Sequence, residues 1–238
     1  MKYIFHLLFL SSFFTANAQK QLVVDANATV RSIEGTFSAI KVSSGINVYL
    51  SQADVTAVAV SASEQKFADA IKTNVSNGVL YINYSGDRMR YNGNNKLNVY
   101  VAFKNIDQIQ GSGAADIVIA GELNVPVLNV QLSGASNLKG QIITNELNVK
   151  LSGASDAKLT GTVKLANFEC SGASDVKSYG LIIDDCNVKA SGASDINITV
   201  TKNISANASG ASNIFYKGDA VIKNQQSSGA SSFAKVQR

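Results

Sequence analysis

The chain has few of the residues on which most enzymes depend. Its 238 residues include no tryptophan, one proline, one histidine and two cysteines. The single histidine, His6, lies in a leader-like segment that we expect to be removed. A chain without histidine has no Ser-His or Cys-His nucleophile and no imidazole for a zinc or iron site. The composition therefore excludes most ordinary enzyme classes, and we expect no catalytic, cofactor-binding or metal-binding residues and no cofactor.

The first residues have the pattern of a secretory signal peptide. Lys2 supplies a positive charge, residues 4–14 are mainly apolar, and Ala-Asn-Ala at 16–18 is a small-residue cleavage site. A membrane anchor is the alternative, but it needs about 20 apolar residues. We expect a signal peptide over residues 1–18, a mature chain from Gln19, and no membrane-spanning segment after cleavage. The location is then the periplasm, the outer-membrane surface or the extracellular space.

Charge gives no sign of a nucleic-acid partner. Loss of Lys2 leaves 20 basic and 17 acidic residues, a net charge of +3. These charges are spread along the chain rather than gathered in one basic stretch. We therefore expect no binding to nucleic acid.

The second half of the chain is a repeat. The tripeptide Ser-Gly-Ala occurs seven times, at intervals of 18 to 21 residues. Its glycines are Gly113, Gly134, Gly153, Gly172, Gly192, Gly210 and Gly229. A fixed period of about 19 residues predicts a solenoid, in which each coil buries its apolar face against its neighbours.

Apolar residues recur at fixed offsets from each repeat glycine and alternate as the inward side chains of strands do. The third coil illustrates this with Ala166, Phe168 and Cys170 before Gly172, and Val176 after it. We expect two strands flanking each turn and a third short strand, near residues 161–165 in that coil. The prediction is an all-β, right-handed parallel β-helix with coils of about 19 residues.

The N-terminal part is less regular. Residues 19–105 carry strand signals at 37–42, 46–50, 55–60, 79–84 and 97–103, and one helical pattern at 63–71. The stretch 85–96 is rich in glycine and asparagine and reads as a mobile loop. We expect this irregular β-rich part to be continuous with a repeat domain over residues 106–238.

Residues 37–52, with the sequence FSAIKVSSGINVYLSQ, contain Gly45-Ile46-Asn47 and precede the Ser-Gly-Ala repeats. This arrangement resembles the auto-transporter adhesin head GIN domain family over roughly residues 30–235. The resemblance implies a pectin-lyase-like β-helix in the envelope of Gram-negative bacteria. It also implies an adhesin role, with no established catalytic residues.

An acidic or amide residue stands three positions after most repeat glycines: Asp116, Asn137, Asp156, Asp175, Asp195 and Asn213. Such residues commonly accept hydrogen bonds from their own turn, and this is the role we expect. Calcium binding is an alternative, although the calcium-binding roll repeats its motif about twice as often. Catalysis is a second alternative, but a catalytic pair needs two carboxyl groups in different environments, and those of this column look alike. Lys139, Lys158 and Lys177, two positions further on, would neutralise it.

An outward asparagine column comprises Asn129, Asn148, Asn167, Asn187 and Asn224. Stacked amides can bond to one another along the rod, which we favour, or can bind a ligand.

Cys170 and Cys186 fall in different columns of adjacent coils, about 14 Å apart on ideal strand geometry. A disulfide spans at most about 7 Å, so we expect two buried free thiols.

Two functions remain open at this point. The first is an exported, non-enzymatic envelope or surface protein, an adhesin or binding scaffold for an unknown glycan or protein. The second is a polysaccharide hydrolase or lyase that uses the aspartate column. The inventory of residues favours the first, and it does not indicate an oligomeric state.

Overall fold

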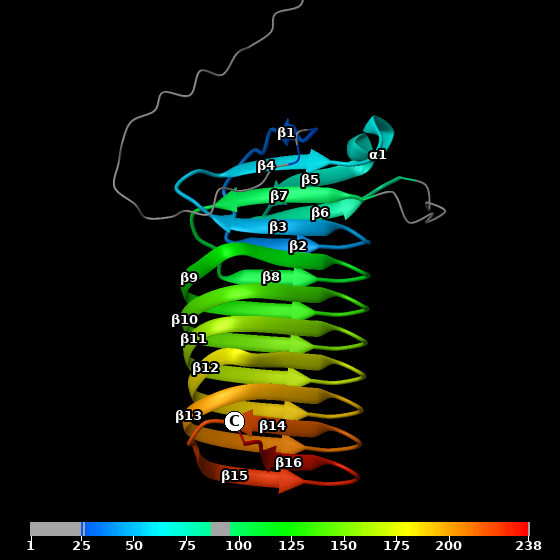
Figure 1. The fold of residues 1–238 in the computed structure, drawn as a ribbon. Coiled ribbons are helices and arrows are strands. Elements are labelled where there is room, and N and C mark those ends of the chain that lie inside the picture. Colours follow the sequence, from blue (N-terminus) through cyan, green and yellow to red (C-terminus); the bar gives the residue numbers. More distant parts are fainter. Residues whose placement is uncertain (1–24, 26, 87–95, 238) are drawn as a thin grey trace, which may run out of the picture.

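The computed structural model describes residue 25 and residues 27–86 and 96–237. The predicted signal peptide and most of the 85–96 link lie outside these residues. The described chain is nearly all β and forms a right-handed parallel β-helix of about seven turns with coils of about 19 residues. The predicted fold class is therefore confirmed, and Figure 1 shows the coils stacked into a rod.

The strands and the single helix follow one another along the rod. The N-terminal elements are β1 (Thr29–Arg31), β2 (Ala39–Val42), β3 (Asn47–Gln52), β4 (Ala57–Ser61), α1 (Gln65–Ala70), β5 (Ile71–Ser76), β6 (Val79–Tyr84), β7 (Asn98–Phe103) and β8 (Gln108–Gly111). The repeat elements are β9 (Asp116–Leu132), β10 (Asn137–Leu151), β11 (Asp156–Cys170), β12 (Asp175–Ala190), β13 (Asp195–Ala208), β14 (Asn213–Lys217), β15 (Val221–Ser227) and β16 (Ser232–Lys235).

Each of the coils formed by β9 to β13 is one long strand rather than the three short ones predicted, and the coil that follows is divided into β14 and β15. In β11 the ladder pairing with β10 continues from Asp156 to Cys170. The chain turns within this strand near Gly161, which has a φ of 111°. The bend at Gly161 therefore leaves the pairing of β10 with β11 in place on both sides of it. Each long strand contributes its first half to one face of the rod and its second half to the other.

The irregular N-terminal part joins the same two faces. On one face β3 pairs in parallel with the first half of β9, aligning Asn47 with Asp116. On the other face β2 pairs with β8, and β8 pairs with the second half of β9. At the far N-terminal end the pairing becomes antiparallel, between β1 and β4 and between β5 and β6. The stacking of strands is thus continuous across residue 105.

The tripeptide Gly45-Ile46-Asn47 forms the first corner of the rod. Ser44 has a φ of 73°, nearly the value of Gly113 in the next coil. Ile46 lies in the position that later coils give to a buried small residue, and it is itself fully buried. Asn47 stands in the same column as Asp116. The motif therefore begins the repeat with different residues in the same backbone path.

The inward columns predicted from the sequence form the core. Phe168, Cys170, Ala166 and Val176 are all 3% exposed or less. Toward the C-terminal end the inward side chains become smaller and then polar. Ala206 and Ala208 align with Gln225 and Ser227 of the fully exposed β15. A polar outer coil is the usual way in which a solenoid ends against water.

Candidate functional site

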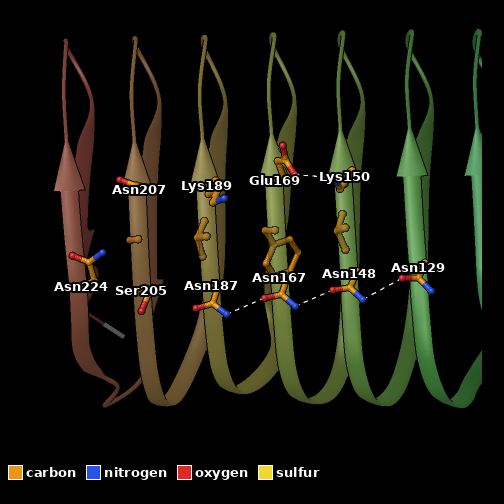
Figure 2. A pocket seen from close by; sticks show the side chains of 14 residues that line it. Asn129, Asn148, Lys150, Asn167, Glu169, Asn187, Lys189, Ser205, Asn207 and Asn224 are labelled. Carbon is orange, nitrogen blue, oxygen red and sulfur yellow. Dashed lines mark hydrogen bonds and ion pairs between the residues drawn. The ribbon is translucent and has the colours of Figure 1, made fainter.

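Four asparagines form a hydrogen-bonded ladder along one face of the rod (Figure 2). The Nδ2 group of Asn148 donates to Oδ1 of Asn129 at 3.1 Å. Asn167 donates to Asn148 at 2.8 Å, and Asn187 donates to Asn167 at 2.9 Å. The predicted amide ladder is therefore confirmed over these four residues, which come from β9, β10, β11 and β12.

Strand register produces this ladder. Asn148 and Asn167 are direct partners in the parallel pairing of β10 with β11. The sequence neighbours of Asn148, Leu147 and Val149, are buried. Side chains alternate between the two sides of a strand, so Asn148 points outward. Adjacent strands lie about 4.8 Å apart, a distance over which one carboxamide reaches the next. The ladder therefore follows from the period of the repeat together with one asparagine in each coil.

The ladder leaves part of its hydrogen-bonding capacity unused. A carboxamide has two N–H donors and an oxygen with two lone pairs. Asn148 uses its second donor on Glu146, at 3.0 Å. The ladder contacts of Asn167 use one donor and one lone pair. The Oδ1 atom of Asn187 receives no donor within the described chain, because Ser205 stands in the next coil in place of an asparagine.

A second outward column runs beside the ladder and carries charge. Lys150 and Glu169 form an ion pair of 3.1 Å between neighbouring coils, with both side chains more than half exposed. Lys189 follows Glu169 in strand register and has no ion-pair partner among the described residues. We call the surface formed by these two columns the ladder face.

A shallow groove of about 590 Å³ follows the ladder face from Asn129 to Asn224. Toward its C-terminal end, Ser205 and Ala206 take the positions held one coil earlier by the larger Asn187 and Val188. Figure 2 shows Asn207 on the same strand as Ser205, and Asn224 on the next coil. The groove therefore ends among polar groups that do not continue the ladder.

The aspartate column lies on the opposite face, and its role differs from the prediction. Asn137 donates to Oδ1 of Asp116, and Asn213 donates to Oδ1 of Asp195 at 2.8 Å. Across the described chain, the hydrogen bonds of these carboxylates go to neighbouring side chains rather than to their own turn. The expectation that each of them caps its own turn is therefore wrong.

A serine that the sequence analysis left without a role closes the turn instead. Ser174 is fully buried, and its hydroxyl donates to the backbone oxygen of Ser171 at 2.8 Å. Equivalent serines make the same contact in the other full coils: Ser136, Ser155, Ser194 and Ser212. The signal for this role was the serine that follows six of the seven Ser-Gly-Ala tripeptides, with Ala115 after the first.

Lys177 neutralises part of the aspartate column, as predicted. Its Nζ lies 2.9 Å from Asp175 and 3.7 Å from Asp156. The hydrogen bond to Asp175 is the main cause that raises the pKa of Lys177 above its usual value, and the charge of Asp156 adds to it. Lys139 and Lys158 align with each other rather than with a carboxylate.

The two cysteines are free and buried, which confirms the prediction made from their columns. Cys170 pairs in register with Ala190, and Cys186 pairs with Ala166. Burial, aided by the charges of Asp175 and Glu169, raises the pKa of the Cys170 thiol to about 12. Burial also raises the pKa of Cys186. Both thiols behave as small apolar core residues.

The described residues show neither a metal-binding cluster nor a membrane-spanning helix. No group of three or more histidine, cysteine, aspartate or glutamate side chains is placed there to hold a metal ion. The same residues include no helix long and apolar enough to cross a membrane.

Comparison with known families decides where the chain belongs. The sequence pattern of the family described as "Putative auto-transporter adhesin, head GIN domain" matches residues 36–220. The chain belongs to this family. The match begins just before β2 and ends just before β15, so the GIN domain takes in both the first corner and the coils that carry the ladder. No curated protein matches the sequence.

Solved structures with the same fold bear related names. A putative adhesin from Bacteroides fragilis aligns with a TM-score of 0.78 at 21% identity, covering 89% of this chain and 98% of its own. A putative adhesin from Parabacteroides distasonis has a TM-score of 0.70 at 18% identity, covering 88% and 96%. A putative lipid binding protein from the same species has a TM-score of 0.62 at 19% identity, covering 90% and 98%. At these identities the likeness establishes the GIN-domain fold.

Proposed function

We propose that this protein is exported to the cell envelope and binds a surface partner there through the ladder face, without transforming it. The envelope here means the periplasm, the outer-membrane surface or the extracellular space. In this role the rod is a rigid scaffold that presents similar polar contacts coil after coil. Repeat proteins commonly use an extended face in this way.

The observation that carries the proposal is the unused capacity of the amide ladder. Its amides sit at regular spacing on a rigid backbone, and several retain a donor or a lone pair that no described group occupies. Such groups lose little conformational freedom when a ligand binds, because the stacked strands already hold them. A flat, pre-organised and polar array of this kind suits recognition of a repetitive ligand.

The names of the family and of the structural neighbours agree with a binding role. Both the family description and two of the related structures refer to adhesins. A third neighbour is named as a lipid-binding protein. The signal-like pattern of residues 1–18 supports export.

The carboxylates of the rod support binding over catalysis. Glycoside hydrolysis needs two carboxyl groups in different environments beside a sugar-binding cleft. In the groove Glu169 is the lining carboxylate, and it is paired with Lys150. On the opposite face Asp156 and Asp175 share Lys177. These contacts are those of structural ion pairs.

The test exposes the mature protein to an array of glycans and surface proteins, and assays every retained ligand for turnover. We expect reproducible retention with no product released. Product release that disappears on replacing Asp156, Asp175 or Asp195 with asparagine would overturn the proposal in favour of a polysaccharide-degrading enzyme. Retention of no array member would also count against it.

Export has its own test in the intact mass of the protein recovered from the producing bacterium. Cleavage after Ala18 gives a chain that begins at Gln19. A cytoplasmic product that keeps residues 1–18 would contradict the proposed location.

A further inference from the structure

The C-terminal end of the groove gathers polar side chains from three successive coils. Asn187 and Lys189 come from β12, Ser205 and Asn207 from β13, and Asn224 from β15, and all five line the groove. Lys189, Ser205, Asn207 and Asn224 make no side-chain hydrogen bond or ion pair within the described chain. The Oδ1 atom of Asn187 is equally without a donor. Figure 2 shows these five side chains on three neighbouring coils.

Together these groups offer both donors and acceptors. The ammonium of Lys189 has three donors, each carboxamide has two donors and two lone pairs, and the hydroxyl of Ser205 does both. Sugar hydroxyls likewise donate and accept, so they can pair with amides in either direction. The end of the groove therefore matches a ligand rich in hydroxyl groups.

The charge of the groove adds a preference of sign. Its charged lining residues are Lys150, Glu169 and Lys189, giving a net charge of +1. Glu169 is committed to Lys150 at 3.1 Å, which leaves Lys189 as the cation without a close counter-ion. A carboxylate on the ligand would supply one. The lining residues include no arginine, whose planar fork favours phosphate.

The shape of the groove selects an extended ligand. It follows the rod over β9 to β13 and β15, and its polar groups recur at about 4.8 Å intervals. One pyranose unit of an extended glycan advances by a comparable distance, so successive sugars can meet successive coils. We propose that the ladder face binds an acidic glycan, lying along the rod with a uronic-acid carboxylate at Lys189 and its hydroxyls on the surrounding amides. This inference rests on the proposed binding function.

The test compares two oligosaccharides of equal length and the same β-linkage, an oligomannuronate and an oligomannoside. They differ in the carboxylate that replaces the hydroxymethyl group of each sugar. Calorimetry of the mature protein at low salt measures both affinities. We expect tighter binding of the oligomannuronate and a loss of that preference at high salt, because exposed charge pairs are screened.

Two exposed variants act in opposite directions. Lys189→Gln removes the counter-ion and is expected to weaken oligomannuronate binding about two- to fivefold, the range for an exposed ion pair. Glu169→Gln removes a repulsive charge and frees Lys150, so it is expected to strengthen that binding. Both variants are expected to change oligomannoside binding less than oligomannuronate binding, because the oligomannoside carries no charge. Lys158→Gln, a lysine on the opposite face, is the matched control and is expected to change nothing.

Each outcome decides the inference. Equal affinity for the two oligosaccharides, absence of binding to both, or equal losses in Lys189→Gln and Lys158→Gln would overturn it. In any of these cases the broader binding function still stands if a neutral glycan or a surface protein on the array is retained. If the array also retains nothing, the proposed function fails with it.

Discussion

Gly172 stacks directly on Gly153, so closely that a Cβ added to Gly172 would lie 2.6 Å from the carbonyl oxygen of Gly153. Gly172 also has a φ of 77°, in the left-handed region. The same carbonyl accepts a hydrogen bond from Ala173 at 2.7 Å, which joins one corner to the next. The Ser-Gly-Ala corner is therefore a position at which neighbouring coils lie too close together to admit a Cβ.

This stacking predicts that Gly172→Ala destabilises the rod severely. The left-handed conformation alone costs a residue with a Cβ about 1–2 kcal/mol, and the contact with backbone adds to that. We expect a loss of at least about 2 kcal/mol in the free energy of unfolding, measured by urea denaturation. Gly45→Ala is the control, because Gly45 has no atom near its would-be Cβ and no left-handed φ. It is expected to change stability by less than about 0.5 kcal/mol, and equal losses in the two variants would contradict the account.

The buried turn serine gives a second prediction. Ser174→Ala removes the hydroxyl that donates to the Ser171 carbonyl at 2.8 Å. One such bond contributes about 0.5–1.5 kcal/mol, so we expect a loss of that size in thermal or urea unfolding. Ser171→Ala is the comparison, since its hydroxyl is half-buried and makes only a long contact of 3.4 Å to Leu151. A larger loss for Ser171→Ala would reverse our assignment of the turn-closing group.

The cysteines are expected to resist modification in the folded protein. Thiolate is the reactive form, and the raised pKa of Cys170, about 12, leaves almost none of it at about pH 8. A thiol reagent should therefore label neither cysteine in the native state and both after unfolding without reductant. A monomer lighter by two hydrogens, with no reactive thiol after unfolding, would show a disulfide and contradict the strand register.

Calcium is expected to leave stability unchanged. Asp156 and Asp175 already share Lys177, and Asp116 and Asp195 accept amide donors. A cation that bound only the folded state would raise the melting temperature, and more so as its concentration rose above its dissociation constant. Equal melting curves in calcium and in chelator are the predicted result, and a rise of several degrees with calcium would assign the aspartate column to metal binding.

The repeat made most of the rod predictable, because a period of about 19 residues with fixed apolar columns leaves few alternatives to stacked coils. The inward positions of Phe168, Cys170 and Val176 follow directly from that spacing. The first corner was harder to recognise, since Ser44 stands where later coils have glycine. Strand β8 was missed because two of its four residues are glutamine, and β5 because it pairs antiparallel outside the repeat.

The site was predictable in part. Register alone placed the asparagines in one column, and their ladder followed. The sequence analysis assigned the turn-closing role to the aspartate column, whereas the structure assigns it to the buried serine. Aspartate and serine both bond readily to turns, and only burial distinguishes them. The sequence also could not show that Lys189 lacks an ion-pair partner among the described residues. Glu169 lies between Lys150 and Lys189, and only the structure shows that it pairs with Lys150.

The central claim, that the ladder face is the binding face, is tested most directly by two matched triple variants. One replaces Asn148, Asn167 and Asn187 on the ladder face with alanine. The other replaces Asn137, Asn197 and Asn213 on the opposite face, so the chemistry and the number of substitutions are the same.

Affinity for the tightest array ligand is measured for both variants and the wild type, with circular dichroism as a check that each remains folded. We predict that the ladder-face variant loses at least about tenfold in affinity, because three amides each lose contacts worth about 0.5–1.5 kcal/mol. The opposite-face variant is predicted to bind as the wild type does. Loss of binding in the opposite-face variant, with the ladder-face variant unaffected, would contradict the account.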